Sequence, residues 1–149
     1  MEKLQALIEI PRDSRERYTW NEAKRAWVVS EALEVTCPEN YGHIPKTIGN
    51  DGEPLDIVVL TDRPLLVGKP FVCRPIGILL RKDGDHKLLA VPLNERRWKT
   101  PEDIPNWRRI RLEAFLTISS PLTGYGDEET AMEVLTEARL RYLQKHGLD

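Results

Sequence analysis

The sequence predicts a mainly β fold, in which a small, mostly antiparallel barrel is followed by helices. Two observations support this: the first hundred of the 149 residues contain short apolar stretches separated by turn residues, and the last third changes to a helical spacing of apolar side chains. The length matches one typical domain, and no repeat or flexible linker divides it, so we expect a single domain over residues 1–149. The apolar fraction of 40% is sufficient for a core without metal or disulfide staples.

The expected strands are short apolar or alternating runs, each bounded by turn residues. A polar stretch from Asn21 to Arg25 indicates a hairpin, and Pro64 with Gly68 marks the turn after the most apolar run. Asp83-Gly84 is a strong hairpin signal between the last two runs. The predicted strands are 4–10, 18–20, 26–29, 54–60, 71–80 and 88–93.

Helices are expected in the last third. Thr100 and Pro101 combine an N-cap hydroxyl with a proline at the first helical position, and Pro105 limits that turn before a helix resumes over 107–115. A second helix begins after Asp127 and ends before Gly147, a residue favoured at helix C-termini. The apolar positions that define the buried face of this helix are Ala131, Val134, Leu135, Ala138 and Tyr142.

Charge and cysteine content exclude several classes of function. The 22 basic and 24 acidic residues give a net charge of -2, which argues against a nucleic-acid partner or an anionic membrane surface. The apolar start is too short for a secretory signal, and no run of about eighteen apolar residues predicts a membrane span. Cys37 and Cys73 are far apart, which favours ordinary thiols in a reducing cytoplasm. We therefore expect a cytoplasmic protein.

Three acids crowd one short stretch, Asp51, Glu53 and Asp56. Gly52 permits a tight bend and Pro54 stiffens the entry to an apolar strand. Carboxylates held this closely raise one another's pKa unless a cation lies among them, and oxygen ligands favour magnesium or manganese over zinc. An EF-hand calcium loop does not fit, because its sixth position must be glycine. The alternative is a solvated turn before a strand.

A second acidic pair, Asp83 and Asp85, flanks Gly84, and Lys87 follows two residues later. Alone, this pattern is also that of a simple hairpin turn. On strands that a small barrel brings together, however, two carboxylate groups beside cations form the arrangement that phosphoryl transfer requires, because metals and cations neutralise the charge on phosphate oxygens.

Six blocks of the sequence follow one another in the order Ile8-Glu9-Ile10-Pro11-Arg12, Ser14-Arg15 with Tyr18, Asn40-Tyr41-Gly42-His43-Ile44-Pro45, Asp51-Gly52-Glu53-Pro54-Leu55-Asp56, Arg74-Pro75-Ile76-Gly77 and Lys87-Leu88-Leu89-Ala90-Val91-Pro92. In this order they resemble the soluble inorganic pyrophosphatases of family I. The resemblance runs over residues 7–93 and continues weakly through the helices. It implies a closed five-stranded OB-type barrel with flanking C-terminal helices, and a magnesium-dependent enzyme that splits pyrophosphate into two phosphates.

The same resemblance implies roles for individual residues. Glu53 stands at the position credited with activating the metal-bound water, with Asp51 beside it, and Glu9 matches an acidic position at the edge of the metal site. Arg17, Tyr41 and Lys87 match phosphate-binding positions. The residues that match the metal-binding aspartates are Asp51, Asp56, Asp83 and Asp85. Magnesium is the expected cofactor, manganese a possible substitute.

The chain also departs from the family pattern. Glu53 replaces an aspartate, Arg17 a lysine, Thr19 a glutamate and Cys37 a tyrosine. No arginine lies between Trp27 and Cys37, and no tyrosine-lysine pair stands near Ile118-Ser119, so the expected phosphate clamp is thinned. Other arginines either reach the site or are surface charges; the candidates are Arg74, Arg81, Arg96, Arg97, Arg108, Arg109 and Arg111.

These observations leave three hypotheses. The first is magnesium-dependent hydrolysis of pyrophosphate by a homo-oligomeric enzyme. The second is a catalytically weakened relative that binds metal, a phosphate ligand or a protein partner, and the third is a hydrolase of another phosphoanhydride. The histidines show no metal-ligand spacing and are expected at the surface or in hydrogen bonds; they are His43, His86 and His146. The four tryptophans are expected in the core; they are Trp20, Trp27, Trp98 and Trp107.

Overall fold

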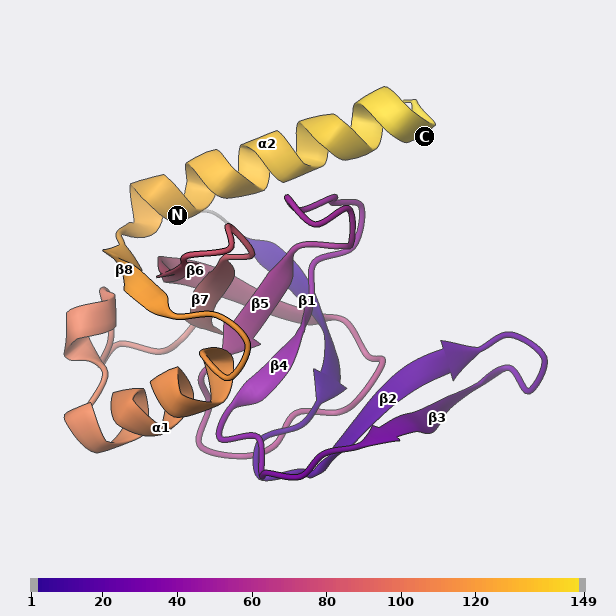
Figure 1. Ribbon diagram of the computed structural model, residues 1–149, viewed down its shortest axis with the longest axis horizontal. Helices are drawn as coiled ribbons and strands as arrows, with labels where there is room; N and C mark the ends of the chain where they lie inside the picture. The colour runs from indigo at the N-terminus through magenta and orange to yellow at the C-terminus, as the bar shows by residue number, and fades with distance from the viewer. Residues whose placement is uncertain (1–2, 148–149) are drawn as a thin grey trace.

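The computed structural model describes residues 3–147 and confirms a mainly β fold whose two α-helices lie in the last third of the chain (Figure 1). The long helix α2 lies across one side of the sheet, and α1 lies on another side. In chain order the elements are β1 (Leu4–Ile10), β2 (Glu16–Asn21), β3 (Ala26–Ala32), β4 (Asn40–His43), β5 (Asp56–Val59), β6 (Phe71–Arg81), β7 (Lys87–Pro92), the 3-10 turn η1 (Pro101–Asp103), α1 (Asn106–Leu116), β8 (Leu122–Gly126) and α2 (Glu128–His146).

Six strands form one sheet in the order β1-β4-β5-β7-β6-β8. Because β1 also pairs with β6, the five strands β1, β4, β5, β7 and β6 close into a hydrogen-bonded ring. The pairing of β5 with β7 is parallel, and the other strand pairs are antiparallel. Strands β2 and β3 form a separate hairpin that projects from the body of the molecule (Figure 1).

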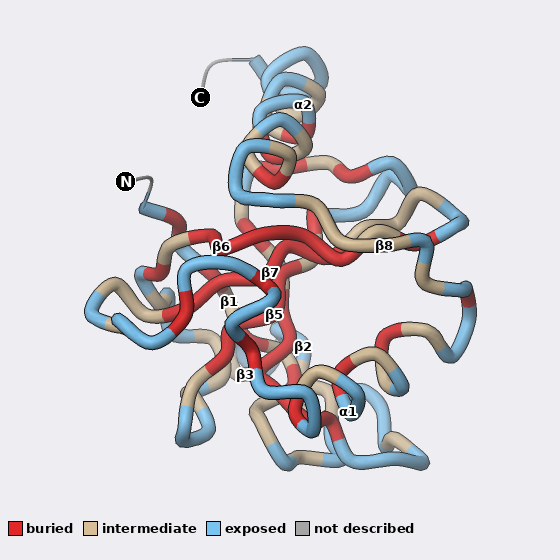
Figure 2. Tube along the Cα trace, turned by 90° about the vertical axis from the view of Figure 1, so that its left-hand side faces the viewer, coloured by how far each residue is buried: buried red, intermediate tan, exposed pale blue. Residues whose placement is uncertain are grey.

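The core lies on both sides of the strands, which appear as the buried interior in Figure 2. Side chains alternate along a strand, so Ile57 and Val59 of β5 pack in the cluster that includes Ala131 and Leu135 of α2. The intervening Val58 packs in a second cluster, to which α1 contributes. A strand covered on both faces needs apolar residues at successive positions, which explains the apolar run of β5.

The predicted strands are confirmed, with small shifts of their ends. Two strands, β4 and β8, were not predicted. In β8, Gly124 and Gly126 interrupt the alternation of side chains. The structure shows why glycine is needed: a Cβ on Gly126 would lie 2.7 Å from the side chain of Ile78 on the neighbouring β6. The side chains of Ile78 and Thr130 therefore leave no room at this position for the side chain that would have signalled a strand.

The predicted helix boundaries are also confirmed. The Asp127 carboxylate accepts a hydrogen bond from the Thr130 backbone N–H at 2.9 Å, and Gly147 ends α2 with φ of 81°. Among residues 3–147, no helix is long and apolar enough to cross a membrane. The expectation that all four tryptophans are core residues holds only for Trp98. Trp20 and Trp107 remain about half exposed, and Trp27 belongs to neither core cluster.

Candidate active site

Lys87 lies at the centre of a group of side chains that come from separate blocks of the sequence and meet in the structure. It opens β7 and stands opposite Asp56, the first residue of β5, in the parallel register of these strands. Its ammonium lies 2.6 Å from Asp56 Oδ2, 2.9 Å from Asp85 Oδ2 and 3.0 Å from the Tyr41 hydroxyl. The side chain is 5% exposed. One buried cation thus gathers two carboxylates and a phenol.

Burial and charge set the protonation states in this group. Burial raises the pKa of Asp56, an effect that Lys87 partly offsets. Burial would lower the pKa of Lys87, but Tyr41 and Asp56 raise it above its usual value, so the ammonium stays charged at neutral pH. Burial also raises the pKa of Tyr41 far above neutrality, and its hydroxyl keeps its proton. The lysine is therefore a cation and the tyrosine a neutral hydrogen-bonding group.

Glu9 forms a second charged group beside the first. Its carboxylate accepts a hydrogen bond from Arg17 Nη1 at 2.7 Å and lies 2.7 Å from His43 Nδ1. Burial raises the pKa of Glu9, but hydrogen bonds and charge from His43 and Arg17 outweigh it and hold the pKa below its usual value. The Arg17 guanidinium also lies 5.6 Å from the centre of the Tyr41 ring, which joins this group to that of Lys87.

His43 is a member of the site that the sequence analysis missed, since lone histidines are usually surface residues. The strand period could have indicated it: Tyr41 and His43 are two residues apart on β4 and so lie on the same face. In the register of β4 with β5, His43 stands opposite Asp56. His43 thus lies on the strand between β1, which carries Glu9, and β5, which carries Asp56.

Arg81, the last residue of β6, is the candidate arginine that reaches predicted site residues. Its Nε lies 3.2 Å from Asp83 Oδ1, and its Nη2 lies 3.6 Å from Asp85 Oδ2. The other candidates with recorded contacts lie elsewhere: Arg74 donates to backbone carbonyls of Glu95 and Trp98, Arg97 pairs with Glu95 and Asp62, Arg108 pairs with Glu39, and Arg109 donates to Pro101 and Asn106.

Asp51 and Glu53 lie in an exposed turn before β5. The Asp51 carboxylate accepts a hydrogen bond from the Glu53 backbone N–H at 2.9 Å. Asn50 donates a hydrogen bond to the carbonyl of Gly84 at 2.9 Å, which holds this turn against the hairpin tip that carries Asp83. Within residues 3–147, neither the Asp51 nor the Glu53 carboxylate contacts Lys87 or Arg81. The turn therefore lies beside the hairpin, but its two acidic side chains are not bonded to the cations of the site.

The carboxylates suit a hard divalent cation in chemistry but are not gathered around a common point. In the described part of the chain, no three His, Cys, Asp or Glu side chains stand in a metal-holding arrangement. Cations separate them: Lys87 stands between Asp56 and Asp85, and Arg81 between Asp83 and Asp85. Asp56 and Asp85 nevertheless each direct a carboxylate oxygen towards Lys87 Nζ. Carboxylate oxygens are the ligands that magnesium prefers.

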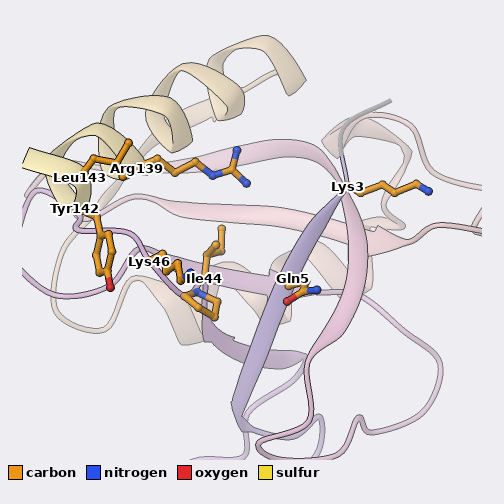
Figure 3. Close-up of a pocket in the computed structure, with 8 residues that line it drawn as sticks. Lys3, Gln5, Ile44, Lys46, Arg139, Tyr142 and Leu143 are labelled. Carbon is orange, nitrogen blue, oxygen red and sulfur yellow. The ribbon is translucent and has the colours of Figure 1, made fainter. Parts of the chain in front are cut away.

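A groove of about 480 Å³ between β1 and the C-terminal half of α2 contains none of the predicted site residues (Figure 3). Its walls include Lys46 and Tyr142, whose side chains lie near each other, whereas Lys3 points away from them. Charge and hydrogen bonding, rather than the size of a hollow, therefore locate the candidate site at the ends of β5, β6 and β7.

Comparisons with known proteins show the family to which the fold belongs. The family model described as "Inorganic pyrophosphatase" matches residues 6–143. The inorganic pyrophosphatase of Xylella fastidiosa is 35% identical over 95% of this chain and 90% of its own length, and that of Campylobacter jejuni is 34% identical over 94% and 92%. The crystal structure of the inorganic pyrophosphatase from Thermus thermophilus superposes with a TM-score of 0.84 at 28% identity, covering 95% of this chain and 91% of that one.

Proposed function

We propose, since this chain belongs to the family I inorganic pyrophosphatases, that the residues around Lys87 form its active site. By homology the chain is an inorganic diphosphatase, which hydrolyses inorganic pyrophosphate to two phosphates. The observation that supports the placement is the convergence of Asp56, Asp85 and Tyr41 on one buried ammonium. A site that binds a highly charged anion needs such a fixed cation next to metal-binding oxygens.

Family I pyrophosphatases depend on magnesium, and the carboxylate donors of this chain fit that ion. The residues that would hold it are Asp51, Asp56, Asp83 and Asp85, with Glu9 at the edge of the site. When bound, magnesium lowers the pKa of a coordinated water and neutralises charge on the phosphate oxygens. Manganese, which accepts the same oxygen ligands, is expected to substitute.

The protein's own groups bind the substrate and move the proton. Lys87 supplies a buried positive charge, Tyr41 a hydroxyl donor, and Arg17 a second cation, to the phosphate oxygens. Glu53, supported by the neighbouring Asp51, accepts the proton of the attacking water. The water oxygen forms the new bond to phosphorus as the bridging P–O bond breaks, and the second phosphate departs.

Phosphate release from pyrophosphate tests this proposal directly. The wild-type protein should release phosphate with magnesium, and much less after its removal with a chelator. The Glu53→Ala variant, which changes an exposed side chain and so should keep its fold, is the matched control. Wild-type release no greater than that of Glu53→Ala would contradict the assignment of Glu53 as the base.

We also propose that the chain is one domain, that its ring of five strands is a closed OB-type barrel, and that it acts in the cytoplasm as a homo-oligomer. Large exposed apolar side chains support association, because such surfaces are commonly buried against another chain. Trp107 and Ile110 lie on α1, and Ile118 lies just beyond its end. Light scattering should give a mass above that of one chain, and Ile110→Glu should lower it.

A further inference from the structure

Arg81 is a buried arginine held between two predicted metal ligands and the end of a helix. Its side chain is 8% exposed. One edge of the guanidinium, formed by Nε and Nη2, faces the Asp83 carboxylate, and Nη2 is 3.6 Å from Asp85. On the other side, Nη1 donates to the Leu116 carbonyl at 3.0 Å and lies 3.4 Å from Ser119 Oγ.

The contact with Leu116 fixes the arginine independently of the two aspartates. Leu116 is the last residue of α1, and carbonyls in the last turn of a helix lack partners within the helix and carry partial negative charge. A guanidinium presents its donors in a rigid planar fork, so an arginine held at Nη1 keeps Nε and Nη2 directed at the hairpin tip. Ser119 belongs to the segment in which the family pattern would place a tyrosine-lysine pair.

Magnesium and the guanidinium need the same carboxylate oxygens. A doubly charged ion that binds Asp83 and Asp85 must therefore displace the Nε edge of Arg81, or share these oxygens with it. The displaced donors would still be buried, and buried donors without partners are unfavourable. A phosphate oxygen supplies the missing acceptor, and Arg–phosphate pairs are commonly bidentate.

We propose that Arg81 acts as the internal counter-ion of Asp83 and Asp85 when metal is absent, and as a phosphate ligand of the substrate once magnesium has bound. It supplies from β6 the cation that is missing near Ser119. This inference rests on the proposed function. It predicts effects of opposite sign: loss of the guanidinium frees the aspartates for magnesium but removes a contact to the substrate.

Two titrations of the full-length protein test the proposal, and neither needs turnover. Calorimetry measures the Kd of magnesium without substrate, and then the Kd of imidodiphosphate, a non-hydrolysable pyrophosphate analogue, at saturating magnesium. In Arg81→Met we expect magnesium to bind about tenfold more tightly and imidodiphosphate about tenfold more weakly than in the wild type, each the size of one charged contact. Arg97→Met is the matched control, because Arg97 also pairs with two acids, Glu95 and Asp62, but away from the site.

If Arg81 were purely structural, its loss would weaken the binding of both magnesium and imidodiphosphate, or change neither. Either result in a folded Arg81→Met protein would overturn the proposal. Thermal unfolding establishes that the variant is folded. If Arg81→Met does not fold, Arg81→Lys replaces it: this variant keeps the charge but loses the planar fork, so magnesium should bind as in the wild type and imidodiphosphate several-fold more weakly. Unchanged binding of imidodiphosphate to Arg81→Lys would then refute the phosphate contact. Absence of pyrophosphate turnover in the wild type would instead contradict the proposed function.

Discussion

Two clusters, each with a buried cation beside carboxylate side chains, differ in how much of the carboxylates they leave open to a ligand. In the first, Arg108 of α1 binds Glu39 through Nε at 2.6 Å and Nη2 at 2.9 Å, and the Glu39 side chain is 1% exposed. In the second, Lys87 is as deeply buried, but its partner Asp85 keeps 25% of its side chain exposed. The first cluster is closed to any ligand, whereas the second buries its cation and presents carboxylate oxygens to solvent.

This difference fits a structural role for the first cluster and the proposed binding role for the second. The Arg108–Glu39 pair joins α1 to the segment before β4, and Trp98 covers the guanidinium at 4.8 Å from the ring centre. Both charges are satisfied, so nothing remains for a substrate. At Lys87 the ammonium is satisfied, but the carboxylates of Asp56 and Asp85 have free lone pairs on their exposed side. Open carboxylates around a fixed cation are suited to a metal and an anion.

The largest effect is expected where the closed cluster is broken. Arg108→Met leaves the Glu39 carboxylate buried without a partner, which should lower the free energy of unfolding by about 3–5 kcal/mol. Urea denaturation followed by circular dichroism measures this loss. Pyrophosphatase activity per folded molecule should stay near that of the wild type, since Arg108 contacts no residue of the proposed site.

A double variant sharpens this result. Glu39→Leu combined with Arg108→Met replaces both charges by apolar side chains, and its stability should recover much of the loss, because the unpaired charge is gone. Recovery would identify desolvation of Glu39 as the cause. A double variant as unstable as Arg108→Met would show that packing of the arginine against Trp98 matters more than its charge.

Removing the cation of the second cluster should mainly affect catalysis. Lys87→Met removes the buried cation, and we expect kcat/KM for pyrophosphate to fall by about 100- to 1000-fold, the usual loss for one preorganised electrostatic contact. Steady-state kinetics with magnesium measures the effect, and calorimetry with magnesium alone provides a separate readout. A Lys87→Met protein with nearly wild-type kcat/KM would place the active site elsewhere.

Local patterns predicted most of the fold, while long-range contacts were harder to predict. Strand β1 and helix α2 follow from alternation and from the caps Asp127 and Gly147, which depend on neighbouring residues alone. Strand β8 was missed because its alternation is interrupted at Gly126, where the contact with Ile78 of β6, more than forty residues away, leaves no room for a side chain. The closure of the ring through β1 and β6 likewise joins distant segments, which periodicity cannot reveal.

The candidate site shows the same division. Asp56, Asp85 and Lys87 could be grouped from carboxylate spacing and family resemblance, and the structure brings them together. The sequence offered seven candidate arginines and no reason to prefer Arg81 among them. Its position depends on where the end of α1 meets β6, which is a long-range contact. His43 was overlooked because a single histidine carries no spacing, although its partner Glu9 was already assigned to the site.

The smallest expected effect concerns pH and the Glu9 group, which lies at the border of the open cluster. The pKa of Glu9 is lowered on folding, so its charged form contributes stability above its ordinary pKa of 4.5, and this contribution is lost as pH falls through the lower, folded value. Glu9→Gln should therefore be less stable than the wild type at pH 7, with the difference shrinking at acid pH below 4.5. Thermal unfolding at several pH values measures it, with exposed Glu22→Gln as control. A difference independent of pH would mean that Glu9 stabilises the protein through packing and not through its charge beside Arg17 and His43.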